Sequence, residues 1–156
     1  MLKWIKSLFS KPQPAGPPQT IRTFSVHETA IAQDGVRVDG NTIRIDFTAN
    51  RTVRLFDVKD PGVEQCLVTY RAEMKAEGIE GRAFLEMWCC LPGRGEFFSK
   101  GVHQAASGTS DWARYEIPFH LKKGQTPELI KLNLIVEGRG VVWLKNIELL
   151  KTPLTS

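Results

Sequence analysis

Cysteine is scarce in this sequence of 156 residues, with only Cys66, Cys89 and Cys90. Three cysteines cannot all form disulfides within one chain. Their positions also lack the repeated spacing that is typical of a metal site. If Cys89 and Cys90 lie in a strand, they point to opposite faces and do not chelate one ion together. The sequence also shows no export signal, so we expect free, largely buried thiols in the reducing cytoplasm.

Long hydrophobic runs and catalytic motifs are missing as well. No stretch approaches the about 20 apolar residues of a transmembrane helix. There is no Gly-x-Ser-x-Gly elbow, His-Glu-x-x-His pair or phosphate-cradling glycine loop. The three histidines, His27, His103 and His120, have no carboxylate near them at metal-ligand spacing. We therefore expect a protein that is not an enzyme and that needs no cofactor or metal.

Helical periodicity is absent from residue 20 onward, where apolar residues instead alternate with a period of two between turn residues. The pattern predicts one all-β domain over residues 20–152, a two-sheet antiparallel β-sandwich of the jelly-roll type. A chain of this length buries enough surface for such a core without disulfides or metal. The candidate strands are 20–27, 35–38, 42–47, 52–58, 65–75, 82–90, 96–100, 112–121, 129–137 and 141–150.

Four of these strands divide into an apolar face and a polar face. In strand 65–75, for example, Val68, Tyr70 and Met74 share the apolar face. The polar faces carry hydrogen-bonding groups around one large aromatic side chain, an arrangement that favours binding of a ligand. The predicted ligand-binding residues are Trp88, Glu86, Arg71, Glu73, Glu116, Lys131 and Asn133. The alternative interpretation is a solvated face, or one covered by the linker or another chain.

Negative charge is missing from the first part of the chain, because the first acidic residue is Glu28. Residues 1–19 carry Lys3, Lys6 and Lys11, which is +3 of the total net charge of +4. The remaining 18 basic residues, 21 minus these three, face 17 acidic residues, so the domain is close to neutral. A neutral domain has no field to attract phosphates, which excludes nucleic acid as the leading partner.

Residues 1–10 combine apolar and basic side chains at helical spacing, which predicts a short amphipathic helix or tail. Alone in water so short a helix is unstable, so it requires something to fold against. The candidate contacts are a membrane surface, a partner protein or the chain's own domain. Residues 11–19, KPQPAGPPQ, predict an extended proline-rich linker. The candidate contact residues of the tail are Leu2, Trp4, Ile5, Leu8, Phe9, Lys3 and Lys6.

The order of features from Ala83 to Leu150 resembles a known family. It runs AFLEMW, GEFFSKG, GTSDWARYEIPFHL and LIKLNLIVEGRGVVWLKNIELL. This order is similar to that of galactose-binding-domain-like jelly rolls, which include many carbohydrate-binding modules. The resemblance implies a jelly roll in which Trp112 and Trp143 are packing residues. Where the family has paired aspartates, often beside a structural calcium, this chain has Lys145 and Asn146, so we do not predict calcium there.

Two functional hypotheses follow. The first is a non-catalytic binding module whose ligand, a carbohydrate under the resemblance, is bound around Trp88. The second is a protein-interaction or assembly module that its N-terminal tail holds at a membrane surface or on a partner, which would make a cytoplasmic protein peripheral to the membrane.

Overall fold

The computed structural model describes residues 13–155, and the predicted tail over residues 1–10 lies outside this range. Strands make up nearly all of its regular structure, beside one short 3-10 helix. The elements are β1 (Gln19–Phe24), β2 (Val36–Asp39), β3 (Thr42–Phe47), β4 (Arg51–Lys59), β5 (Cys66–Leu91), β6 (Gly95–Lys100), η1 (Val102–Gln104), β7 (Ala106–Leu121) and β8 (Leu129–Pro153). Within residues 13–155, no helix is long and apolar enough to span a membrane.

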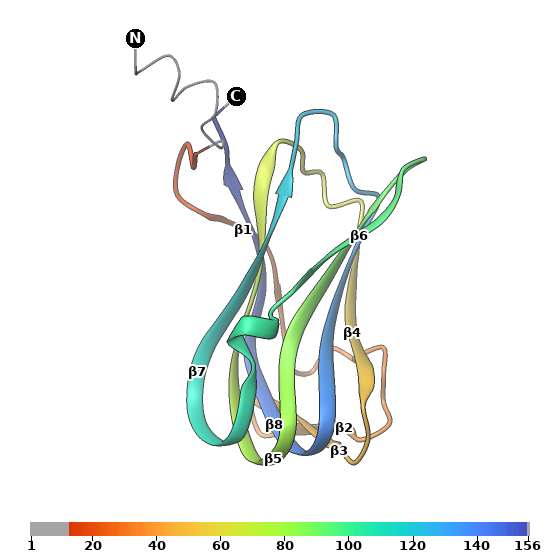
Figure 1. Cartoon of the computed structure of the whole chain (residues 1–156). Helices are drawn as coiled ribbons and strands as arrows, with labels where there is room; N and C mark the ends of the chain where they lie inside the picture. Colours follow the sequence, from red (N-terminus) through yellow and green to blue (C-terminus); the bar gives the residue numbers. More distant parts are fainter. Residues whose placement is uncertain (1–12, 156) are drawn as a thin grey trace.

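The strands form an antiparallel sandwich of two layers, which confirms the predicted fold class (Figure 1). Layer A contains β7, the first half of β5, the second half of β8, β1 and the hairpin of β2 and β3. Layer B contains β6, the second half of β5, the first half of β8 and β4. All pairs of neighbouring strands run antiparallel.

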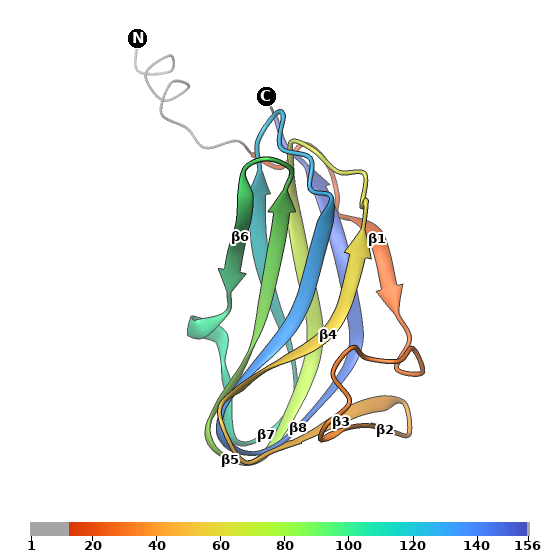
Figure 2. The ribbon, with the colours of Figure 1, turned by 90° about the vertical axis from the view of Figure 1, so that its right-hand side faces the viewer.

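Strands β5 and β8 each belong to both layers. Each strand runs the length of one layer, turns at the lower end of the molecule and returns in the other layer (Figures 1 and 2). The predicted strands 65–75 and 82–90 are thus the two arms of β5, and 129–137 and 141–150 are the arms of β8. The two turns pair with each other, with Gly81 opposite Gly138. We call this the glycine arch.

The core lies between the layers and consists of the apolar faces that the alternation predicts. Val68, Tyr70, Met74, Leu132 and Leu134 are fully buried. Burial of such side chains is the main source of stability in a fold of this kind. The one hydroxyl among them, on Tyr70, donates a hydrogen bond of 3.3 Å to the backbone carbonyl of Asn133, which satisfies a polar group that would otherwise be costly to bury.

The predicted linker is partly joined to the domain. The amide of Ala15 donates to the carbonyl of Pro153 over 2.7 Å, and the amide of Thr155 donates to the carbonyl of Gln13 over 2.9 Å. Both ends of the described chain therefore lie together at the upper end of the sandwich, opposite the glycine arch (Figure 1).

Candidate functional site

The outer face of layer B carries a hollow of about 430 Å³. Strand register brings its residues together in rows, because register partners project from the same face. Glu86 on β5 is opposite Lys100 on β6 and Asn133 on β8, and Asn133 is opposite Arg54 on β4. In the next row, Trp88 lies between Phe98 and Lys131. The hollow is lined by Thr52, Arg54, Glu86, Trp88, Glu96, Lys100, Lys131 and Asn133.

The floor of this hollow is a buried polar network. Glu86 and Asn133 are only 3% and 4% exposed, although both project from the outer face. Asn133 Nδ2 donates to Glu86 Oε1 over 2.9 Å, and Lys100 Nζ lies 3.5 Å from Glu86 Oε2. The Oδ1 atom of Asn133 is buried and accepts no hydrogen bond from the described residues. A buried acceptor left open in this way is costly unless a ligand or water satisfies it.

Trp88 lines the hollow, and Phe98 lies against it. The rings of Trp88 and Phe98 lie 5.2 Å apart between centroids at an angle of 54°. Phe98 is 54% exposed, and the amine of Lys100 lies 4.6 Å from its ring centroid. Exposed aromatic rings beside directional polar groups are typical of sites for amphipathic ligands, whose apolar faces stack while their polar edges form hydrogen bonds.

At one end of the hollow, Lys131 Nζ donates to Glu96 Oε1 over 2.7 Å. This hydrogen bond lowers the pKa of Glu96 and raises the pKa of Lys131, so both remain charged near neutral pH. The thiol of Cys90 also donates to Glu96, and burial is the main cause that raises its pKa to about 11. Because the thiol form persists at neutral pH, Cys90 does not supply a thiolate nucleophile to this site.

The structure places the seven predicted ligand residues on two faces instead of one. Trp88, Glu86, Lys131 and Asn133 line the hollow of layer B. Arg71, Glu73 and Glu116 project from the outer face of layer A, because β5 changes layer at the glycine arch. The structure therefore does not bring all seven residues together in one site.

Sequence reasoning missed several lining residues of the layer B hollow, namely Thr52, Arg54, Glu96 and Lys100. The two residues from β6 had an available signal. The turn Pro92-Gly93-Arg94-Gly95 predicts a hairpin, which places Glu96 and Lys100 beside Cys90 and Glu86. Thr52 and Arg54 on β4 had no such signal, because β4 pairs with β8, which is distant in sequence.

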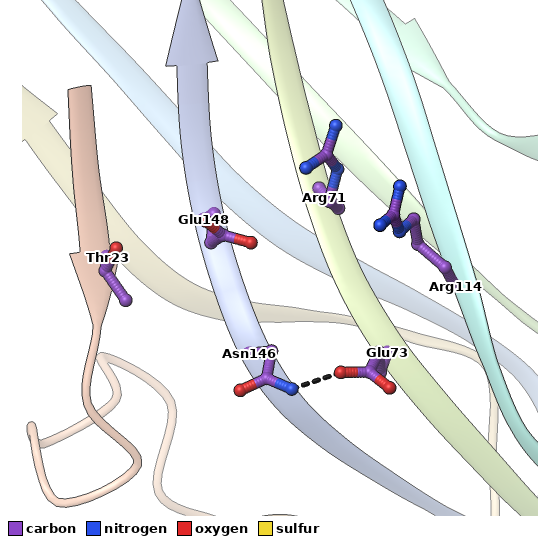
Figure 3. Close-up of a pocket in the computed structure, with 6 residues that line it drawn as sticks. All are labelled: Thr23, Arg71, Glu73, Arg114, Asn146 and Glu148. Atoms are coloured by element: carbon purple, nitrogen blue, oxygen red, sulfur yellow. Dashed lines mark hydrogen bonds between the residues drawn. The ribbon is translucent and has the colours of Figure 1, made fainter. Parts of the chain in front are cut away.

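The outer face of layer A carries a second hollow, of about 370 Å³ (Figure 3). Arg71 forms an ion pair with Glu116, with 3.3 Å between Nε and Oε2. Glu73 accepts a hydrogen bond from Asn146. The lining residues are Thr23, Arg71, Glu73, Arg114, Asn146 and Glu148, which come from β1, β5, β7 and β8.

The two tryptophans of the family resemblance lie on the outer face of layer A, partly buried. The Lys145 amine lies 4.2 Å from the Trp112 ring centroid. Trp143 donates from Nε1 to Asp39 over 3.1 Å, and the Arg44 guanidinium lies 5.2 Å from its ring centroid. Both indoles are thus packed under cations. Across residues 13–155, no group of three His, Cys, Asp or Glu side chains is placed to hold a metal ion.

No protein-family model matches the sequence, and no curated protein matches it. Solved structures do match. The CBM22-1 xylan-binding domain from Paenibacillus barcinonensis Xyn10C aligns with a TM-score of 0.58 and 15% identity, over 90% of this chain and 99% of that one. The chain thus has the β-sandwich jelly-roll fold of carbohydrate-binding modules, as the sequence resemblance predicted.

Two further matches have lower TM-scores. A family 29 carbohydrate-binding module variant complexed with mannohexaose aligns at 0.49 and 14% identity, over 85% of this chain and 94% of that one. The CBM22-1 and GH10 modules of Clostridium thermocellum endo-1,4-β-D-xylanase 10B, complexed with xylohexaose, align at 0.48 and 10% identity, over 87% of this chain and 25% of that one.

Proposed function

We propose that the chain is a non-catalytic module that binds a saccharide on the outer face of layer B. The observation that carries this proposal is the Trp88 ring, which lies against Phe98 and lines the same hollow as the polar side chains of Arg54, Lys100 and Glu96. A sugar combines the two properties that this surface requires. Its ring has an apolar face, and its hydroxyls both donate and accept hydrogen bonds.

The hydrogen-bond donors and acceptors of the hollow match the hydroxyl groups of a polyol. A sugar hydroxyl donates to the carboxylate of Glu96 and accepts in turn from the amine of Lys100 or the guanidinium of Arg54, which line the same hollow. The hydrogen bond from Asn133 to Glu86 fixes the asparagine amide before a ligand arrives. Fixed polar groups lose little entropy on binding, so this preorganisation favours affinity.

The fold comparison supports the same class of ligand. The structure with the TM-score of 0.58 is described as a xylan-binding domain. Since one fold serves many functions, the residues of the hollow carry the proposal.

The test is a broad glycan screen of the full chain, followed by calorimetric titration of the best ligand into the chain and its variants. We expect Trp88→Ala and Phe98→Ala to weaken binding by about tenfold or more, because each removes stacking area. Phe97→Ala is the matched control, since Phe97 is the neighbouring exposed aromatic residue of β6 and projects to the other side. The absence of any binding in the screen, or unchanged affinity in Trp88→Ala, would overturn the proposal.

A second function, contact with an anionic membrane surface through residues 1–10, is favoured by the upper end of the sandwich. Gln13 pairs with Thr155 there, so the basic N-terminal segment joins the domain at this end. A hollow of about 290 Å³ nearby is lined by Lys122, Lys123 and Leu154, among others. Basic and apolar side chains together are the combination that attracts a protein to anionic lipid.

Vesicle sedimentation tests this second function. We expect the full chain to sediment with vesicles that contain about 30% phosphatidylserine and to be released as salt is raised. A chain that starts at Gln13 keeps the pairing with Thr155 and should lose most of the binding. Equal sedimentation of the two chains would exclude a membrane role for the segment.

A further inference from the structure

The layer A hollow has its own charge arrangement, which the saccharide proposal for layer B does not use. None of the six residues that line it lines the layer B hollow. Two arginines, Arg71 and Arg114, come from the neighbouring strands β5 and β7, and Glu148 and Asn146 come from β8 on the other side of β5 (Figure 3).

Arg114 lacks the ion pair that strand register offers it. Glu73 is its register partner on β5, and oppositely charged partners at such positions normally pair. Glu73 instead accepts a hydrogen bond from Asn146 (Figure 3). Among the described carboxylates, none forms an ion pair with Arg114. Its guanidinium is therefore available to an anion from outside.

Arg71 contributes to the same side of the hollow. Its register partner on β7 is Glu116, two residues along the strand from Arg114, so the two arginines are diagonal neighbours on one face. Only Nε of Arg71 is bound to Glu116. The remaining N–H groups of both guanidinium groups have the planar geometry that recognises a carboxylate.

The opposite wall carries acceptors. Glu148 forms no ion pair with the described residues. Asn146 has a φ of 51°, a left-handed conformation that the β-bulge opposite Arg71 and Glu73 imposes. Asparagine is among the non-glycine residues that adopt left-handed backbone most readily, so it suits this bulge position. Here the amide group of Asn146 is fixed by Glu73, which leaves Oδ1 as an acceptor.

We propose that the layer A hollow is a second binding site, for an acidic saccharide whose carboxylate lies between Arg71 and Arg114. The neutral hydroxyls of the same sugar donate to Glu148 and to Oδ1 of Asn146. A phosphate or an acidic peptide fits less well, because Glu73 and Glu148 repel a second negative charge placed on their side. A uronic acid has one charge at one edge and hydroxyls at the other, as this hollow requires.

The experiment is an NMR titration of the nitrogen-15-labelled full chain with galacturonate, which carries one carboxylate, with galactose as the matched neutral sugar. We expect galacturonate to shift the signals of Arg71, Arg114, Asn146 and Glu148, and to bind less tightly as NaCl rises from about 20 mM to about 500 mM. Arg114→Gln should lower its affinity by about tenfold or more, since a charge-assisted hydrogen bond is lost. The matched control is Arg94→Gln, which removes the same charge from an exposed turn between β5 and β6.

The Trp88→Ala variant separates this site from the one on layer B. If the proposal holds, galacturonate still shifts the layer A signals in that variant, whatever happens to neutral glycans. Loss of galacturonate binding in Trp88→Ala would place the acidic sugar on layer B and overturn the proposal. Equal affinity of Arg114→Gln and the unaltered chain for galacturonate, or galactose shifting the same layer A signals as strongly as galacturonate, would also overturn it.

Discussion

Asn133 donates a hydrogen bond of 2.9 Å to Glu86 across β8 and β5, and both side chains are more than nine-tenths buried on a face that points away from the core. Lys100 compensates the charge of Glu86 from one side. A charge so placed is tolerated only while its partners stay in position. The pair thus gives the outer face of layer B a fixed arrangement of polar groups.

Replacing Asn133 by Asp tests this relationship. The substitution brings two carboxyl groups together in a buried site, so ionisation of both is unfavourable and the pKa of the pair rises above the unfolded value of about 4. Below about pH 4 the carboxyl groups are protonated in both the folded and the unfolded chain, so the substitution causes no charge repulsion. The loss of stability grows as pH rises toward the pKa of the pair in the folded chain. We expect a loss of about 3 kcal/mol at neutral pH, measured by urea unfolding, with recovery in acid.

Asn50→Asp is the control for that prediction. Asn50 accepts a hydrogen bond from the Gly138 amide through Oδ1, which an aspartate preserves, and the residue is exposed. The free energy of unfolding of the Asn50→Asp variant should therefore change little between neutral and mildly acidic pH. A similar pH dependence in the two variants would show that the Asn133 site does not behave as a buried pair.

The buried thiols predict loss of stability in alkali. Burial is the largest cause that raises the pKa of Cys89 to about 12 and of Cys90 to about 11, from an ordinary value of 9.0. Above about pH 9 the unfolded chain loses these protons while the folded chain keeps them, so stability falls as pH rises toward the folded pKa values. Each thiol contributes up to about 1.4 kcal/mol per pH unit.

The measurement is the free energy of unfolding between about pH 8 and about pH 11. In a Cys89→Ala, Cys90→Ala double variant, the slope with pH should be clearly smaller, even though the variant is less stable throughout. An unchanged slope would assign the alkaline loss to lysine and tyrosine groups instead.

The strands and the core could be predicted from the sequence because both depend on local alternation. Strand β3 begins and ends where the pattern predicts, and the inward side chains of β5 and β8, such as Tyr70 and Leu134, are buried. Alternation assigns a face by counting residues along one uninterrupted strand. The sequence shows each arm of β5 and β8 separately, and each was predicted correctly.

The grouping of the site residues could not be predicted in the same way. Counting from Glu73 to Glu86 gives no information on whether the strand stays in one layer, since that depends on how β5 and β8 bend together at residues 77–81 and 137–141. The bend carries Glu86 and Trp88 to layer B and leaves Arg71 and Glu73 on layer A. The only local signal was the cluster of glycines, which alone indicates a turn but not its partner strand.

The bend itself depends on the glycine arch. Gly81 has a φ of 127° and Gly138 a φ of 83°, both in the region that other residues avoid. A Cβ atom on Gly138 would lie 1.7 Å from the backbone oxygen of Glu80, and one on Gly81 would lie 2.0 Å from that of Glu137. Because backbone atoms cannot move aside as a flexible side chain does, either alanine forces the two strands apart.

We expect Gly138→Ala and Gly81→Ala each to reduce the free energy of unfolding by about 3 kcal/mol or more, measured by urea denaturation. Gly93→Ala separates the two causes, since Gly93 also has a positive φ, 71°, but no atom lies within 4 Å of the added Cβ. It should cost only the about 1 to 2 kcal/mol of left-handed strain. An equal loss of stability in all three variants would contradict this explanation. It would show that the positive φ alone, and not the close packing of the two strands, requires glycine at the arch.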